Sequence, residues 1–216
     1  VGGRQSAPPA HQTTPEAPEL QEALRAIADA SDRAAVIEAT SHGLALDRVG
    51  AIPFAAGILT NLTRDHLDFH GSVEAYHEAK LRLVAAIRSS SASRAAGLVP
   101  TIVLPTDYPA AEPFANAAAA AGIRIARFGV GGDGSLLING VAHRVELAMP
   151  GHVNALNAAA ALTLIDAWNL PLTPAIAAVA AEPGPPGRAE RIDAGQPFTV
   201  LVDFAHTGAS MQAAME

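Results

Sequence analysis

The stretch 101–128 decides the fold class. It reads TIVL at 101–104, PFANAAAAA at 113–121 and IRIARF at 123–128. A short apolar run, a helix-length run of small residues and a second apolar run predict a strand, a helix and another strand. Alternation of strands with helices is typical of a parallel sheet covered by helices. The stretch therefore predicts an α/β fold.

The same alternation continues on both sides of this stretch. Upstream, we expect a helix beginning near Glu16, although Pro18 sits awkwardly in its first turn. Downstream, we expect a hairpin with its turn near Asn139-Gly140. The other predicted elements are strands at 34–38, 54–59 and 199–203 and helices at 73–88, 154–168 and 174–181. Together they predict a mostly parallel sheet flanked by helices.

Composition excludes several classes of protein. Half of the 216 residues are hydrophobic and only 4% are aromatic, so aliphatic side chains must fill the core. The net charge of −7 excludes a generally basic nucleic-acid binder and gives no sign of a polybasic membrane anchor. The absence of cysteine excludes disulfides, zinc knuckles and a cysteine nucleophile. No apolar run reaches the ~18 residues of a membrane span, and no secretory signal opens the chain. We therefore expect no membrane insertion and a cytoplasmic protein.

The densest polar segment is TNLTRDHLDFHG at 60–71, directly after a predicted buried strand. Two aspartates and two histidines fall within six residues, from Asp65 to His70. Carboxylate oxygens and imidazole nitrogens both bind divalent cations, so the segment could hold a metal ion. The alternative is a solvated loop in which Asp65 or Asp68 caps a turn.

Lys80 is the only lysine of the chain. On the predicted helix it falls near the middle of an apolar stripe, where a lone lysine is costly unless it is paired or neutralised. Either its stem covers the core while the ammonium reaches water, or the amine is buried and functional. A neutral amine can react with carbon dioxide to form a carbamate, an anionic oxygen ligand for a metal. The stripe consists of Val73, Tyr76, Leu83, Val84 and Ile87.

The segment EATSH at 38–42 follows another predicted buried strand. Glu38 could bind a metal, and Ser41 could hydrogen-bond a substrate. The alternative is that Thr40 or Ser41 caps a helix.

Three further sites carry candidate binding residues. Asn154 and Asn157 lie one helical turn apart and could pair with a purine edge, unless Asn154 is only an N-cap. Arg188 follows the proline-rich hinge 183–187 and could reach a phosphate when domains close, although composition alone favours a solvated surface arginine. Asp203 ends a predicted strand and could bind a ribose hydroxyl or brace the loop.

These segments together resemble the Mur ligases, and specifically the MurE type, which adds the third amino acid of the peptidoglycan stem peptide. The match extends in the family's order over nearly the whole chain. The segment 60–71 with its following Lys80 is its most specific part. The other matching residues are Thr13-Thr14-Pro15, EATSH at 38–42, Asn154 with Asn157, GRAE at 187–190 and DFAH at 203–206.

The resemblance implies a reaction and its participants. ATP phosphorylates the terminal carboxylate of a UDP-MurNAc-peptide, and an amino acid then attacks the acyl phosphate to form an amide. ATP and Mg²⁺ are the implied cofactors, and UDP-MurNAc-peptide and an amino acid are the implied partners.

The resemblance also implies roles for particular residues. Lys80, carbamylated, and Arg188 are the implied catalytic residues, with Arg188 meeting the γ-phosphate. The implied metal ligands are Glu38, His66 and Lys80; the adenine and ribose contacts are Asn154, Asn157 and Asp203; and the UDP-MurNAc-peptide contacts are Thr13, Thr14, Ser41 and Arg48.

The resemblance further implies a domain organisation. Residues 1–187 correspond to part of the P-loop-type ATP-binding middle domain, and residues 188–216 to the start of a Rossmann-like C-terminal domain with its first strand. The family's glycine-rich phosphate loop should lie upstream of Thr13 and does not occur there. We therefore expect a fragment that is inactive alone. The alternatives are a folylpolyglutamate synthase-like ligase, a non-catalytic nucleotide- or substrate-binding homologue, or a metal hydrolase.

Overall fold

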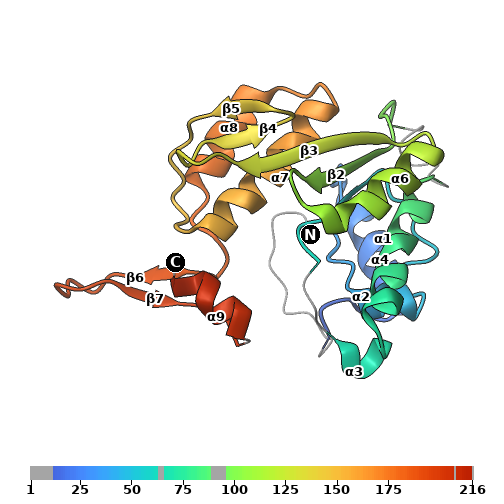
Figure 1. Ribbon diagram of the computed structural model, residues 1–216, viewed down its shortest axis with the longest axis horizontal. Helices are drawn as coiled ribbons and strands as arrows, with labels where there is room; N and C mark the ends of the chain where they lie inside the picture. Colours follow the sequence, from blue (N-terminus) through green and yellow to red (C-terminus); the bar gives the residue numbers. More distant parts are fainter. Residues whose placement is uncertain (1–11, 63–65, 89–95, 207, 216) are drawn as a thin grey trace. The chain divides into compact units, whose positions relative to one another are not determined.

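The structure, a computed structural model, describes residues 12–62, 66–88, 96–206 and 208–215 (Figure 1). The chain divides into two compact units. The first unit takes in residues up to Ala55 and the segment 62–100. The second unit takes in residues 56–61 and everything from Thr101 onward.

A five-stranded sheet is the framework of the second unit (Figure 1). Its strands lie in chain order: β1 (Ala56–Ile58), β2 (Thr101–Pro105), β3 (Arg124–Val130), β4 (Leu136–Ile138) and β5 (Val141–His143). The pairs β1–β2 and β2–β3 are parallel, whereas β3–β4 and β4–β5 are antiparallel. Every residue of β2 is buried, as in a strand covered on both faces. The predicted α/β fold is confirmed, with a sheet that the hairpin makes mixed.

The hairpin turns where the sequence predicts. Asn139 and Gly140 have φ angles of 48° and 84°. Two consecutive positive φ angles define the turn whose twist matches paired strands, and Asn-Gly is its preferred sequence. The strands are shorter than expected, because residues 144–147 lie outside β5.

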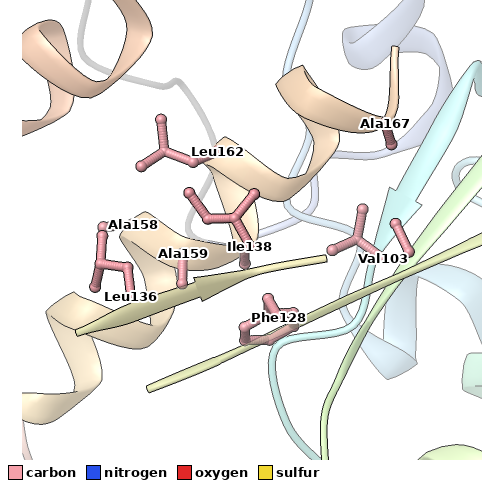
Figure 2. Close-up of a cluster of buried hydrophobic side chains, with 10 residues drawn as sticks. Val103, Phe128, Leu136, Ile138, Ala158, Ala159, Leu162 and Ala167 are labelled. Carbon is pink, nitrogen blue, oxygen red and sulfur yellow. The ribbon is translucent and has the colours of Figure 1, made fainter. Parts of the chain in front are cut away.

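Helix α7 (His152–Ala167) packs against one face of the sheet (Figure 2). Its alanines leave room for the helix to lie close to the strands. Helix α8 (Leu172–Ala181) adds Ile176 and Val179 to the same cluster. The fully or nearly buried members of this core are Val103, Ala126, Phe128, Leu136, Ile138, Ala158, Ala159, Ala160, Leu162 and Ala167.

Shorter elements complete the second unit. A 3-10 turn, η1 (Pro109–Ala111), and helix α6 (Glu112–Ala120) connect β2 to β3. After α8 the chain forms an antiparallel pair, β6 (Glu190–Ile192) with β7 (Val200–Val202), and then helix α9 (Gly208–Met215). The strand expected at 199–203 is therefore found as β7, while β6 was not expected. That residues 188–216 begin a separate domain stays a prediction.

Four helices form the described part of the first unit: α1 (Ala17–Asp29), α2 (Ser41–Ala45), α3 (Leu67–His70) and α4 (Val73–Arg88). Pro18 does not interrupt α1, contrary to expectation. It lies in the first turn, where the missing N–H would have no partner inside the helix. Glu16 and Glu19 complete this helix start with a reciprocal capping box. The core of this unit contains Leu20, Leu44, Val49 and Ile52.

The strand predicted at 34–38 is wrong. These residues adopt no regular secondary structure, Val36 is fully exposed and Glu38 is exposed. A strand needs a neighbour to complete its hydrogen bonds, and the first unit offers none among the residues described. The carbonyl of Glu38 instead accepts a hydrogen bond from the hydroxyl of Thr14.

Candidate functional site

Thr14 joins the start of α1 to the segment that enters α2. Its side chain is fully buried. Thr14 Oγ1 donates to the Glu38 carbonyl at 2.7 Å, accepts from the Thr40 N–H at 3.0 Å and lies 2.9 Å from Thr40 Oγ1. Thr40 Oγ1 in turn accepts from the Gly43 N–H at 3.1 Å and so caps α2. The capping role considered for Thr40 is thus confirmed.

Ser41 and Arg48 bring unpaired polar atoms to this network. Ser41 is 2% exposed, and its Oγ has no hydrogen-bond partner. Arg48 Nη1 donates to the Thr14 carbonyl at 3.2 Å, and Nη2 pairs with Glu16 at 2.8 Å, but the buried Nε is unpaired. Buried polar atoms without partners are rare in native proteins. The two atoms therefore mark a place where a polar ligand could bind.

Imidazole rings gather at the junction of α2 and α3. His66, in the left-handed conformation with φ 55°, precedes α3. The ring of His42 lies 4.6 Å from that of His66, edge to face, and 4.1 Å from that of Phe69. His70 lies 5.5 Å from His42 and 5.6 Å from Tyr76, and its Nε2 is buried without a partner.

Burial lowers the pKa of His70 below its ordinary value of 6.5. Positive charges on His42 and His66 lower this pKa further, Asp68 opposes them, and Lys80 adds a smaller lowering effect. His70 is therefore neutral near pH 7.

Lys80 lies on α4 beside this group of rings. It is half-buried, and its Nζ lies 5.2 Å from the centre of the Tyr76 ring, within cation–π range. Tyr76, Val84 and Ile87 are buried as the stripe predicts. Arg82, two residues further on, donates to the carbonyls of Leu44 and Ala45 and so ties α4 to the end of α2.

The described residues form no metal cage of their own. Among them, no group of three or more histidines, aspartates or glutamates could hold a metal ion. Of the two aspartates and two histidines of the segment 60–71, Asp65 lies outside the described residues, and the other three do not form such a group. Glu38 and His66 are both exposed. The carboxylate of Glu38 is the kind of ligand that Mg²⁺ takes together with substrate phosphates.

The asparagine pair lies at the start of α7, in the second unit. The N-cap of this helix is Gly151, so the N-cap role considered for Asn154 is wrong. Asn154 instead donates from Nδ2 to the Pro150 carbonyl at 2.7 Å. Asn157, one turn further, is exposed.

Asp203 braces the loop that precedes β6. Its carboxylate accepts from the Ala189 N–H and from the Ala205 N–H, each at 2.7 Å. Arg188 is exposed, with its guanidinium 4.8 Å from the centre of the Phe204 ring. A cavity of about 310 Å³ lies beside this loop and is lined by Ala148, Pro150, Pro183, Gly184, Pro186, Ala189, Glu190 and Arg191.

The predicted residues divide between the two units, and we call the two sets the first and the second cluster. The first unit holds Thr14, Ser41, Arg48, His66 and Lys80, with Thr13 exposed. The second unit holds Asn154, Asn157, Arg188 and Asp203. Sequence reasoning gave no individual role to His42, Tyr76 or Arg82. The spacing of Tyr76 one turn before Lys80 is the signal that could have identified it.

Comparison with known proteins places the chain in a family. Residues 1–165 match the Mur ligase middle domain. The chain belongs to the Mur ligase family. This confirms the resemblance drawn from the segments at 38–42, 60–71 and 80.

The curated relatives that the chain matches have more specific names than the family. The chain is 38% identical over 226 residues to the UDP-N-acetylmuramyl-tripeptide synthetase of Roseiflexus sp. (strain RS-1), covering 96% of this chain and 44% of that protein. It is 34% identical to the UDP-N-acetylmuramoyl-L-alanyl-D-glutamate–2,6-diaminopimelate ligase of Mesorhizobium japonicum, covering 90% of this chain and 42% of that one. The chain therefore spans less than half the length of these relatives.

Solved structures agree on the fold. A UDP-N-acetylmuramoyl-L-alanyl-D-glutamate–2,6-diaminopimelate ligase superposes with a TM-score of 0.72 at 28% identity, over 92% of this chain and 42% of that one. MurF from Acinetobacter baumannii superposes with a TM-score of 0.59 at 20% identity, over 75% of this chain and 36% of that one. In the described ranges, none of the helices has the length and apolar character needed to cross a membrane.

Proposed function

We propose that this chain is part of a MurE-type ligase that adds the third amino acid to UDP-MurNAc-dipeptide through an acyl phosphate, at the expense of ATP. The observation that carries the proposal is the pair of buried, unpaired atoms, Ser41 Oγ and Arg48 Nε, in the same unit as the single lysine. Similarity to proteins named UDP-N-acetylmuramyl-tripeptide synthetase supports this choice within the family. Because ATP is its substrate, we place the protein in the cytoplasm.

Ser41, Arg48 and the exposed Thr13 bind the UDP-MurNAc-peptide in this proposal. Arg48 is held by Glu16 and by the carbonyl of Thr14, so it meets the substrate in a fixed orientation. Ser41 Oγ is free to donate to, or accept from, the substrate because Thr40 already caps α2. Fixing both groups before binding lowers the entropy lost on binding.

The reaction balances in two steps. A carboxylate oxygen of the peptide attacks the γ-phosphorus of ATP, the bond to ADP breaks, and an acyl phosphate forms. The amine of the third amino acid then attacks the acyl carbon, phosphate leaves with the attacking oxygen, and the amine loses a proton. Arg188 offsets negative charge on the transferred phosphoryl group.

Lys80 acts as a carbamate in this reaction. The lone pair of its neutral amine attacks carbon dioxide, and the nitrogen loses a proton to water. Glu38, His66 and the Lys80 carbamate would hold Mg²⁺, which when bound supplies positive charge to the phosphate oxygens.

The nucleotide is held by the second cluster. Asn154 and Asn157 face the adenine side, and Asp203 orients the loop that carries Arg188. The cavity beside this loop has a volume of about 310 Å³. Its lining by the proline-rich segment 183–187 fits a hinge that closes on its substrate.

Oxygen-18 transfer tests the proposed reaction. The protein at its natural length is incubated with ATP, the third amino acid and UDP-MurNAc-dipeptide labelled with oxygen-18 in both carboxylate oxygens. We expect ADP release that requires the dipeptide, and one labelled oxygen in the released phosphate. Phosphate without label would contradict the acyl phosphate, and ADP release indifferent to the dipeptide would contradict the ligase.

A further inference from the structure

We propose that Asn139-Gly140, at the turn of the hairpin, is a site of spontaneous deamidation and that Asp166 on α7 restrains the reaction. Asn139 is the only asparagine of the chain that a glycine follows. Glycine has no side chain to hinder attack by its own nitrogen, so an Asn-Gly pair is among the most reactive sequences for this chemistry. Both residues are exposed, so water reaches them. The inference is independent of the proposed function.

The reaction exchanges the side-chain amide for a carboxylate and needs only water. The nitrogen of Gly140 attacks Cγ of Asn139, and its proton passes through water to Nδ2, which leaves as ammonia. The product is a five-membered succinimide. Water then opens the ring at one of its two carbonyls. Breaking the new Cγ–N bond leaves aspartate, whereas breaking the original peptide bond leaves isoaspartate. One water is consumed and one ammonia is released.

Both polar atoms of the Asn139 amide are held in the folded hairpin. Oδ1 accepts from the Arg127 N–H at 3.2 Å, and Nδ2 donates to Asp166 Oδ2 at 2.6 Å. The backbone is held as well, since the Asn139 N–H donates to the Arg127 carbonyl at 2.9 Å. Ring closure needs Cγ within bonding distance of the Gly140 nitrogen. A side chain held at both amide atoms has little freedom to reach it.

Asp166 is the partner that acts on the leaving group. It lies in the last turn of α7, so its bond to Asn139 joins the hairpin to this helix. A hydrogen bond to an ionised carboxylate is stronger than one between neutral groups, and this bond must break before ammonia leaves. The Arg127 N–H belongs to the backbone, so no side-chain substitution removes it. Asp166 is therefore the group whose removal tests the restraint.

The modification changes the contacts of the hairpin. Aspartate at position 139 would place a carboxylate oxygen where Nδ2 stands, 2.6 Å from Asp166 Oδ2. Two ionised carboxylates have no hydrogen to share, and their like charges repel. The new carboxylate would therefore turn away from Asp166 and withdraw the acceptor of the Arg127 N–H. Isoaspartate adds a methylene to the backbone and would distort the turn itself.

Mass spectrometry of the aged protein tests the site. Trypsin releases residues 128–144 as one peptide, and its fragmentation locates a change at position 139. The protein at its natural length is incubated in mildly alkaline buffer, beside the same protein in urea and a synthetic peptide of residues 128–144. We expect aspartate and isoaspartate at position 139 in all three samples, forming about tenfold more slowly in the folded protein. Equal rates in the folded protein and in urea would overturn the restraint, and no change at position 139 in urea would overturn the site.

Variants of Asp166 test its part in the restraint. Asp166→Ala removes the acceptor, and we expect the folded variant to deamidate about threefold faster than wild type, or more. Asp166→Asn keeps an oxygen that accepts from Nδ2, so its rate should stay within about twofold of wild type. Glu146→Ala, which removes an exposed carboxylate of the same unit, is the matched control. An unchanged or lowered rate in Asp166→Ala would overturn the proposal. If Asp166→Ala does not fold, Asp166→Ser, whose side chain is one bond shorter than that of aspartate, gives the same test with the same expected result.

Amide hydrogen exchange measures the consequence for the hairpin. Asn139→Asp imitates the aspartate product, and we expect exchange at the Arg127 amide to accelerate about tenfold. Combining Asn139→Asp with Asp166→Asn reverses donor and acceptor, so the double variant should exchange within about twofold of wild type. Unchanged exchange in Asn139→Asp, or equally fast exchange in the double variant, would overturn the repulsion between the two carboxylates.

Discussion

The two clusters of candidate residues are built in opposite ways. In the first unit, Thr14 and Ser41 are buried, and Arg48 is fixed between a carboxylate and a carbonyl. In the second unit, Asn157 and Arg188 are exposed, and the bonds of Asp203 hold backbone rather than other side chains. The first cluster is therefore organised before any ligand binds. In the second, Arg188 follows the glycine- and proline-rich segment 183–187, which suits a residue that takes its final place on binding.

The largest expected effect is a loss of kcat on substitution of a residue in the first cluster. Lys80→Ala should lower kcat about a thousandfold, because it removes a charge that acts on the phosphoryl transfer. Acetate should restore part of this activity by supplying a carboxylate in the vacated space, as measured by ADP release over a range of acetate concentrations.

Two variants control this experiment. Lys80→Arg keeps the positive charge but cannot form a carbamate, so it should be as inactive as Lys80→Ala and should not respond to acetate. Arg25→Ala removes an exposed basic residue that pairs with Asp29, and it should leave kcat within about twofold. Wild-type activity in Lys80→Arg would contradict the carbamate.

A smaller effect measures how tightly the first unit is packed. Gly43→Ala would place a methyl group 2.7 Å from Thr14 Cγ2, against a side chain that three hydrogen bonds hold in place. We expect the free energy of unfolding to fall by about 1–3 kcal/mol in urea titration.

The matched substitution lies in the sheet of the second unit. At Gly129 the nearest atom to an added Cβ is Leu137 Cδ1 at 3.6 Å, an ordinary contact. Gly129→Ala should therefore change the free energy of unfolding by less than about 1 kcal/mol. Equal losses in the two variants would contradict the difference between the units.

The smallest effect is a difference in pH dependence. The pKa of His70 is lowered in the folded state by burial and by the charges of His42 and His66, with Asp68 opposing them and Lys80 adding to the lowering. The unfolded chain therefore binds a proton at higher pH than the folded chain. The first unit should lose stability as the pH falls through 6.5 toward the lowered pKa of His70.

The second unit should respond only in a more acidic range. Hydrogen bonds from Ser135 lower the pKa of Asp133 from 3.8, with Arg144 contributing and burial opposing. The stability that Asp133 contributes is present above pH 3.8 and is lost as the pH falls through its lowered pKa. Urea titrations from pH 8 to pH 5 should show that the free energy of unfolding falls as the pH is lowered. His70→Phe should reduce this dependence on pH, and Asp133→Asn should not. An unchanged pH dependence of the free energy of unfolding in His70→Phe would contradict this role of His70.

The elements that follow from local patterns were predictable from the sequence. Helix α4 begins and ends at the expected residues, and Asn139-Gly140 turns the hairpin, because periodicity and turn chemistry are local properties. The strand at 34–38 failed because a strand depends on a partner elsewhere in the chain. An apolar run such as Ala34 to Ile37 does not reveal whether that partner is present.

The candidate site was predictable as residue types but not as contacts. The sequence singles out Ser41, Lys80 and Arg48 through their place in family-like segments. It does not reveal what the Thr14 hydroxyl contacts, because this depends on the positions of Glu38 and Thr40, more than twenty residues away. Nor does it show the ring of Tyr76 beneath the Lys80 amine, since that contact depends on side-chain geometry.

The division of labour between the clusters can be measured directly by determining KM for both substrates in Ser41→Ala and in Asn157→Ala. We expect Ser41→Ala to raise KM for UDP-MurNAc-dipeptide about tenfold and to leave KM for ATP unchanged, as for one lost hydrogen bond to a charged ligand. Asn157→Ala should raise KM for ATP and leave KM for UDP-MurNAc-dipeptide unchanged. An increase in KM for both substrates in either variant, or no change in KM in both variants, would contradict the assignment of the first cluster to the peptide and the second to the nucleotide.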